Sequence, residues 1–415
     1  MCSRPLLSLG LVLGLAATAR GGVVDGTVSF ILNGRSDPRD GNIYTVVPLY
    51  AGVHLSVRDL ELRYAEDLRL ELDGWLGGLL GQPIDGQRFV GDLNVFSIEA
   101  RFARRHIHVR LGRQVMIGGA ARFTHLDGAS LTLEGAGFGL TAFGGVPVIP
   151  RFGVKVGDAA AGGRLFYRFG YESQLGVSFI HVEDSGRTGR QDLALDFRTR
   201  PIRMLTLTGL GVLSLVERDL AEVDVAAVLA PHTTLDVRAD FRQQRPDLFI
   251  PRASIFSVFA NSSRKEAGGQ LDYRPHSRLA FDADYHLILD ETGTGHRGGL
   301  RGTVHLGPSG ELLIGSELRL LQLPDKGYKE ARLFVSFRIL PTLVASLDGD
   351  AYFFTTPING WIRSITGAAS LGWDFRPGWR VVASGAASST PFVQGGFDAM
   401  VKLAYNASHR FREHR

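Results

Sequence analysis

Apolar and polar residues alternate along most of this chain, and the segment Gln270–Leu289 shows the pattern in its simplest form. On each side of a predicted turn at Pro275–Ser277, every second residue is apolar. Successive side chains of a β-strand point to opposite faces, so the segment predicts a hairpin with one apolar and one charged surface. The charged surface of its second strand carries Asp282, Asp284 and His286.

The same alternation continues from residue 24 to residue 405 and predicts about 22 strands, within a range of about 18 to 22. Its phase shifts once near the start, because apolar positions are odd-numbered up to Val57 and even-numbered from Leu60. A one-residue shift turns every side chain to the other face, so a turn or a bulge must lie at Arg58–Asp59. We favour a turn there. A second candidate turn, at Glu66–Asp67, leaves the strand count unchanged.

Short turns and longer polar segments follow one another along the second half of the chain. This layout, with about 10 residues of alternation per strand, is typical of an up-and-down antiparallel barrel in the outer membrane, with short periplasmic turns and longer extracellular loops. The short turns are predicted at 199–201, 231–232, 275–277, 308–310, 341 and 376–378, and the longer loops include 183–190, 290–299 and 323–330.

A soluble all-β fold is the alternative. A propeller would show one repeated motif per blade, and a sandwich would need a second core layer, and the sequence indicates neither. Nearly every strand instead has one apolar and one charged face, which fits lipid outside a barrel and water inside it. Aromatic residues near predicted strand ends would form the girdles at the two membrane interfaces: Tyr273, Tyr352, Phe353, Trp373 and Trp379.

The first 19 residues predict a secretory signal peptide. Arg4 supplies the positive charge, Pro5–Ala16 the apolar segment, and Ala17–Ala19 the small residues of a cleavage site. The one cysteine, Cys2, falls inside this segment. The mature chain, starting near Arg20, is therefore expected to lack disulfides and a lipid anchor, as suits an exported bacterial envelope protein.

Composition adds few constraints. The chain has 415 residues, of which 44% are hydrophobic and 21% charged, with a formal charge of +4. Basic residues alternate with acidic ones and form no basic tract, so nucleic-acid binding is not expected. No haem-attachment motif and no metal-ligand spacing occurs, so we expect no cofactor and no metal. The predicted domain is a single barrel over residues 20–406, followed by a polar tail over 407–415.

The chain resembles bacterial outer-membrane porins, without matching one identified family. The resemblance rests on the signal peptide, the repeated hairpins and the last strand GGFDAMVKLAY, which alternates and ends in the aromatic Tyr405. The segment Leu111–Gly128, with the sequence GRQ followed by a predicted loop at Gly118–Gly128, is similar to a segment of several large porin families. Porins usually end on a terminal aromatic residue, whereas here a polar tail follows, unless Phe411 takes that place.

The charged faces predict the residues that line the pore. Rows of positive and negative side chains create a field across a water-filled pore and so orient solutes, although the same charges also pair across strands. The candidate lining residues are Arg164, Arg168, Asp236, Arg238, Asp240, Arg242, Asp282, Asp284, His286, Arg332 and Arg338.

The segment Gln243–Gly269 is the longest predicted loop of the second half, and its middle is rich in Phe and Ile. An exposed apolar loop is costly, so it is expected either to fold into the barrel mouth as a constriction or to pack on neighbouring loops. The candidate constriction residues are Arg252, Arg264, Lys265 and Glu266.

Three functions are compatible with these patterns. The first is a porin or channel for passive diffusion of small polar solutes or ions across the bacterial outer membrane, which would not be an enzyme. The second is a barrel sheath or scaffold around an electron carrier or an exported polymer. The third is an outer-membrane hydrolase centred on Asp284 and His286, because carboxylates and an imidazole on one face activate water. Expected partners are membrane lipid and small solutes, with a homo-oligomer or a periplasmic partner as further options.

Overall fold

The computed structural model describes residues 22–39, 42–62, 65–80, 89–148, 158–170, 172–245, 263–307 and 310–411. The predicted signal peptide lies outside the described residues. No helix in the described part has the length and apolar character needed to cross a bilayer. The elements are β1 (Gly22–Arg39), β2 (Asn42–Val46), β3 (Pro48–Leu62), β4 (Ala65–Leu79), β5 (Phe89–Phe102), β6 (Ile107–Gly118), the 3-10 helix η1 (Gly119–Ala121), β7 (Arg122–Gly135), β8 (Phe138–Pro147), β9 (Ala159–Phe169), β10 (Ser173–Asp184), β11 (Arg187–Ile202), β12 (Leu205–Ser214), β13 (Asp219–His232), β14 (Leu235–Gln244), β15 (Arg264–His276), β16 (Leu279–Asp290), β17 (Gly293–Leu306), β18 (Leu312–Gln322), β19 (Gly327–Leu340), β20 (Leu343–Ile358), β21 (Trp361–Arg376), β22 (Trp379–Ser389) and β23 (Gly396–Phe411).

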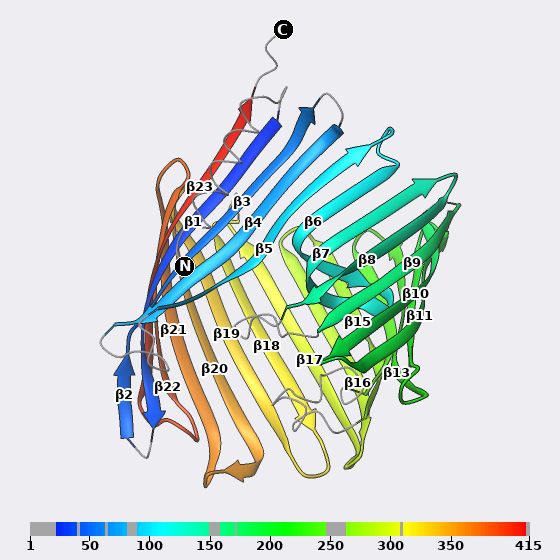
Figure 1. Ribbon diagram of the computed structural model, residues 1–415. Coiled ribbons are helices and arrows are strands. Elements are labelled where there is room, and N and C mark those ends of the chain that lie inside the picture. Colours follow the sequence, from blue (N-terminus) through cyan, green and yellow to red (C-terminus); the bar gives the residue numbers. More distant parts are fainter. Residues whose placement is uncertain are drawn as a thin grey trace.

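The strands form one closed antiparallel barrel (Figure 1). Each strand pairs with its neighbours in sequence, and β23 closes the sheet on β1. β2 and β3 pair with β1 in one continuous register, because Arg35 faces Val46 and Leu32 faces Leu49. They are two parts of one strand, so the 23 described strand segments make a wall of 22 strands. The predicted fold class and strand count are confirmed.

The number of wall strands is even, so the start of β1 and the end of β23 lie at one end of the barrel, the upper end in Figure 1. We call it the terminal end and the other the distal end. Described turns at the terminal end are short, such as Ser277–Arg278 between β15 and β16, two residues later than the turn predicted from Pro275.

Of the longer loops expected at the distal end, 183–190 and 290–299 are mostly strand, and 323–330 is strand from Gly327 onward. The hairpin of β10 and β11, for example, closes through Ser185 and Gly186 alone. Both residues have positive φ, 55° and 76°, which suits the tight turn of a two-residue hairpin. Polar residues next to such a turn continue the ladder, so polarity was the wrong guide to loop length.

The phase shift near the start of the chain is a bulge and not the favoured turn. β3 runs on through Asp59 to Leu62, and its register with β4 shifts between Val57 and Leu60. Asp59 has φ 57°, and its backbone N–H donates to the Asp67 carboxylate at 3.2 Å. The carboxylate satisfies a backbone group at the bulge, so the strand bends without ending.

The closing strand is longer than predicted, because β23 includes residues 407–411 of the expected polar tail. These residues pair with the beginning of β1, and Phe411 faces Gly22. Interior side chains support the seam. The Thr27 hydroxyl donates to Asn406 at 2.8 Å, and the Ser408 hydroxyl donates to Asp25 at 2.6 Å. The polar residues of this segment therefore belong to the wall.

One face of the wall is an apolar surface that is exposed along many of the described strands. Leu300, Leu318, Leu333 and Leu347 are 54–62% exposed on four different strands, too much for core residues. In a closed barrel such a surface faces lipid. At the terminal end the girdle contains a chain of rings, with centroids 5.6, 6.1 and 4.6 Å apart from one to the next: Trp373, Phe375, Trp379 and Tyr405.

One predicted girdle residue is on the wrong face. Phe353 shares the parity of the lipid-facing Leu347 and is 50% exposed, whereas Tyr352 shares the parity of the polar Asp348 and Asp350. Adjacent strand residues point to opposite faces, so Tyr352 faces the interior.

The lipid assignment predicts the effect of a buried charge. Leu333→Arg should reduce the free energy of unfolding by about 2–4 kcal/mol, because it places a cation in hydrocarbon near the middle of β19. Ser336→Arg, on the interior face of the same strand, is the matched control and should have little effect. Denaturant titrations of protein folded into lipid vesicles measure both. Equal losses for the two variants would contradict the assignment of faces.

Candidate functional site

The second face of the wall carries polar side chains that meet across an intervening strand. Arg110 of β6 donates to Glu71 of β4 at 2.9 Å, and Arg164 of β9 donates to Asp196 of β11 at 3.0 Å. Side chains on strands that flank a third approach each other on the concave side of a curved wall. This face is therefore the barrel interior.

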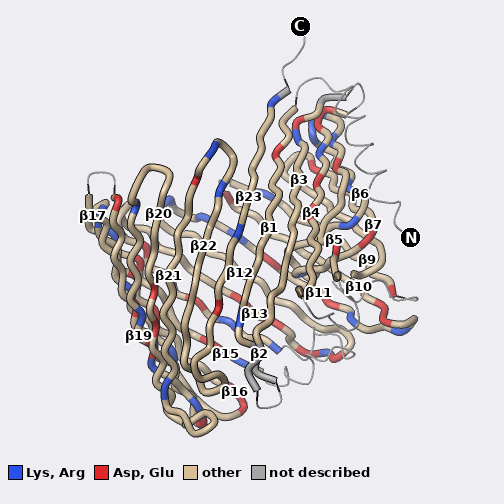
Figure 2. Tube along the Cα trace, turned by 90° about the vertical axis from the view of Figure 1, so that its left-hand side faces the viewer, with Lys and Arg blue, Asp and Glu red and all other residues tan. Residues whose placement is uncertain are grey.

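All eleven predicted lining residues have the parity of this interior face. Several of the cations among them hold acidic partners: Arg164 pairs with Asp196, Arg168 with Glu134, Arg242 with Asp224, and Arg332 with Asp348. Basic and acidic residues are accordingly interspersed along the strands in Figure 2. These pairs brace neighbouring strands as well as lining the interior, and a role in solute passage remains a prediction.

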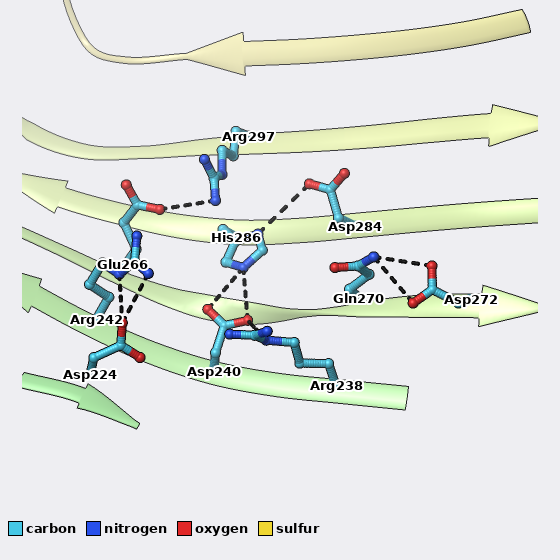
Figure 3. Close-up of polar contacts among 10 residues, drawn as sticks. All are labelled: Asp224, Arg238, Asp240, Arg242, Glu266, Gln270, Asp272, Asp284, His286 and Arg297. Carbon is cyan, nitrogen blue, oxygen red and sulfur yellow. Dashed lines mark hydrogen bonds and ion pairs between the residues drawn. The ribbon is translucent and has the colours of Figure 1, made fainter. Parts of the chain in front are cut away.

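His286 is the centre of a group of polar contacts on this face (Figure 3). Its Nε2 lies 3.2 Å from an oxygen of Asp240 on β14, and its Nδ1 lies 3.8 Å from Asp284. Asp240 also pairs with Arg238 at 3.3 Å. The imidazole is only 5% exposed, so it ties β14 to β16 and offers little surface to a substrate.

The Asp-x-Asp-x-His pattern does not form one catalytic group. Asp282 lies in register with Asp272 on one side and Arg301 on the other, away from the contacts of His286. The carboxylate nearest to His286 comes instead from Asp240, two strands away. Within the described residues, no cluster of three or more His, Cys, Asp or Glu side chains could hold a metal ion.

The hairpin of β6 and β7 folds into the barrel. Its tip, η1, packs against interior residues near the middle of β10, where the backbone N–H of Ala120 donates to the Ser178 hydroxyl at 2.8 Å. Ala120, Leu126, Ile180 and Val212 are fully buried in one cluster that joins the hairpin to the wall over β10–β12. A tip held against the inner wall at mid-depth narrows the interior. The loop predicted at Gly118–Gly128 is therefore two paired strands and a single helical turn.

Ionic contacts fix the hairpin tip to the wall. Arg122, at the start of β7, lies 3.0 Å from Glu222 of β13, with both side chains less than 15% exposed. Arg190 of β11 donates to the carbonyl of Ala120 at 2.5 Å and to Asp192 at 2.6 Å. Charges removed from water in this way are stable only when they are paired, so the contacts specify one position for the tip.

Glycine allows the close approach. Gly119 has φ 53°, and a Cβ atom placed there would lie 2.1 Å from the Ser178 hydroxyl. On the flanking strand the amide of Gln114 is fully buried, where its Oε1 accepts from Ser130 at 2.9 Å. The sequence signal for this close approach is the run of small residues Gly118–Ala121 directly before Arg122, because its only side chains are two methyl groups.

The predicted constriction loop is only partly described. Arg252 and residues 246–262 lie outside the described residues. Arg264, Lys265 and Glu266, predicted as loop residues, are the first residues of β15. Arg264 and Glu266 form an ion pair at 2.5 Å, and Glu266 also pairs with Arg297 at 3.2 Å, whereas Lys265 has the opposite parity. A constriction by the loop therefore stays a prediction, and among the described residues it is the β6–β7 hairpin that enters the interior.

The fold agrees with that of solved outer-membrane pores. The barrel of the P pilus usher PapC, described as a translocation pore, is similar with a TM-score of 0.51 and 9% identity, over 93% of this chain and 99% of that one. Two Pseudomonas aeruginosa proteins are less similar, OccK3 with a TM-score of 0.46 and 10% identity and OccK1 with 0.41 and 12%. Each alignment covers at least 93% of this chain and 96% of the other. No protein-family model and no curated protein matches the sequence. The closed barrel and its lipid-facing belt are the architecture of bacterial outer-membrane proteins, which places this chain in that membrane.

The position of the hairpin tip predicts a specific cross-link. The only natural cysteine is Cys2, so Ala120→Cys together with Ser178→Cys introduces one new pair within the barrel. Because the Ala120 N–H lies 2.8 Å from the Ser178 hydroxyl, mild oxidation should form a disulfide and shift the mobility of the unreduced protein. Ala120→Cys with Val177→Cys, whose second position faces lipid, should not cross-link. Absence of the first cross-link in folded protein would contradict the inward position of the tip.

Proposed function

We propose that this chain is an outer-membrane channel for passive diffusion of small polar solutes or ions. The observation that carries the proposal is the interior face, which is charged and polar around a closed barrel while the outer face is apolar. Such a wall lets water and hydrated solutes occupy the interior.

The inward hairpin supports the channel reading. Barrel diameter grows with strand number, and a wall of 22 strands encloses more space than the 16–18 strands of common porins. An unobstructed opening of that width would pass large molecules. The tip of the β6–β7 hairpin, bound across the interior to β10–β13, reduces the opening and makes selection among small solutes possible.

The proposed mechanism is diffusion past fixed charges. Lumen ion pairs such as Arg164 with Asp196 present a donor and an acceptor side by side, which replace part of a solute's hydration without binding it tightly. Passage needs such weak contacts, because a solute that binds too strongly does not leave.

Removal of the hairpin tip tests the proposal. Replacing Met116–Thr124 by Asn-Gly joins Val115 and His125, which already face each other, through a favoured two-residue turn. Glu222→Gln in the same variant removes the acid that would lose Arg122. We expect single-channel conductance in planar bilayers to exceed that of the full-length Glu222→Gln control, because the opening is wider. Folded protein that conducts in neither form would overturn the channel function, and equal conductance would overturn the role of the hairpin.

A further inference from the structure

Three aromatic side chains form a patch on the interior face near the distal end. They are Tyr328 of β19 with Tyr352 and Phe354 of β20. Tyr328 faces Phe354 in the strand register, and the rings of Tyr328 and Tyr352 are 5.5 Å apart. Tyr352 and Phe354 are nearly parallel, with centroids 6.5 Å apart and an angle of 12°. All three are half-buried, so part of each ring is exposed to the lumen.

A carboxylate with an unused acceptor lies beside this aromatic patch. Glu330 faces Tyr352 on one side and Arg319 on the other. It is only 6% exposed, and its Oε2 has no hydrogen-bond partner among the described residues. The Tyr352 hydroxyl forms a hydrogen bond with this carboxylate, so Glu330 orients one of the two hydroxyl groups of the aromatic patch.

The aromatic surface continues toward the terminal end. Phe334 has the same parity as Tyr328 and lies about 20 Å farther along β19, at 3.4 Å per residue. Its ring covers Gly315, where a Cβ atom would approach it to 2.1 Å. The guanidinium carbons of Arg301 and Arg332 lie 5.0 and 5.3 Å from its centroid.

Most of the charges along this strip are paired, and Asp350 faces Arg332 in the register. Arg319 pairs with Glu317, and Arg332 with both Glu317 and Asp348. Donors and acceptors therefore alternate over a short distance without a strong net field. The carboxylates would repel an anion. The guanidinium groups of Arg301, Arg319 and Arg332 would repel an organic cation near the aromatic rings.

From this arrangement, we propose that the strip of Tyr328, Glu330, Tyr352 and Phe354 is a binding site for neutral saccharides entering the channel. The inference rests on the proposed channel function and names its solute class. A sugar ring has apolar C–H faces that pack on aromatic rings, and its hydroxyl groups both donate and accept. One hydroxyl would donate to the Tyr352 hydroxyl oxygen, which lies beside the Glu330 carboxylate, and neighbouring oxygens would accept from Arg319. Each contact is modest, as transport requires.

Sugar-induced blocking of the channel current tests the inference. Glucose, sucrose, raffinose and stachyose are added to single channels on each side in turn. We expect current interruptions that lengthen with chain length and are more frequent from the distal side. Tyr352→Ala and Glu330→Gln should each raise the half-blocking concentration by about two- to tenfold. The matched control Phe353→Ala, on the lipid face of the same strand, should leave it unchanged.

Two results would overturn the saccharide site while leaving the channel in place. One is an open channel that sugars do not block, or block equally in wild type and Tyr352→Ala. The other is stronger blocking by gluconate or glucosamine than by glucose, which would mean that charge decides. Calorimetric titration of stachyose into folded protein in detergent measures the site without conductance. Its failure would remove the site, whereas a missing current with sugar binding intact would remove only the passive channel.

Discussion

The structure depends on one constraint, the need of every backbone N–H and C=O group in the bilayer for a hydrogen-bond partner within the protein. A sheet meets this need only when it has no edge, so the chain must close β23 on β1. Closure then assigns every side chain of a strand to one of two environments, because each residue points either to lipid or to the interior. The alternation of apolar and polar residues in the sequence follows from these two environments. Even the polar residues 407–411 follow it, since the seam is completed by their pairing with β1.

A wide barrel pairs all the backbone groups of its wall, but its interior is too wide to be filled by a packed core. Two devices compensate in this chain. Ion pairs between strands that flank a third, such as Arg110 with Glu71, hold the curvature of the wall from inside. The β6–β7 hairpin supplies the only large buried apolar cluster formed on the interior face of the described residues, where Leu126 and Ile180 are fully buried. The constriction is thus also a local core, which fixes its position more firmly than a surface loop could be fixed.

The sequence predicts the wall well and the interior poorly, for a physical reason. A strand is identified by a period of two residues, a local property, so the number of strands and their faces follow from the chain alone. The hairpin tip depends on contacts such as Ala120 with Ser178, 58 residues apart, and no local pattern encodes them. The bulge at Asp59 is a similar case, because its stabilising partner is the carboxylate of Asp67 on the next strand. The alternation places His286 on the charged face, but its nearest carboxylate, on Asp240, comes from two strands away.

The same distinction applies to Tyr328 and Glu330, which lie where a predicted polar loop meets the strand that follows it. They follow Pro324 and Gly327 in a polar segment, and polarity alone suggested solvent. In a water-filled barrel, however, a polar residue at the end of a strand is as well solvated on the interior face as in an exposed loop. Once the register places Tyr328 opposite Phe354 and Glu330 opposite Tyr352, the residues lie together as one surface with paired charges and half-exposed rings. An interior lined only for hydration would not need aromatic rings there, since they weaken contact with water. Their presence beside a buried carboxylate is the basis for our proposal that this part of the wall contacts a solute with both apolar and hydroxyl-bearing faces.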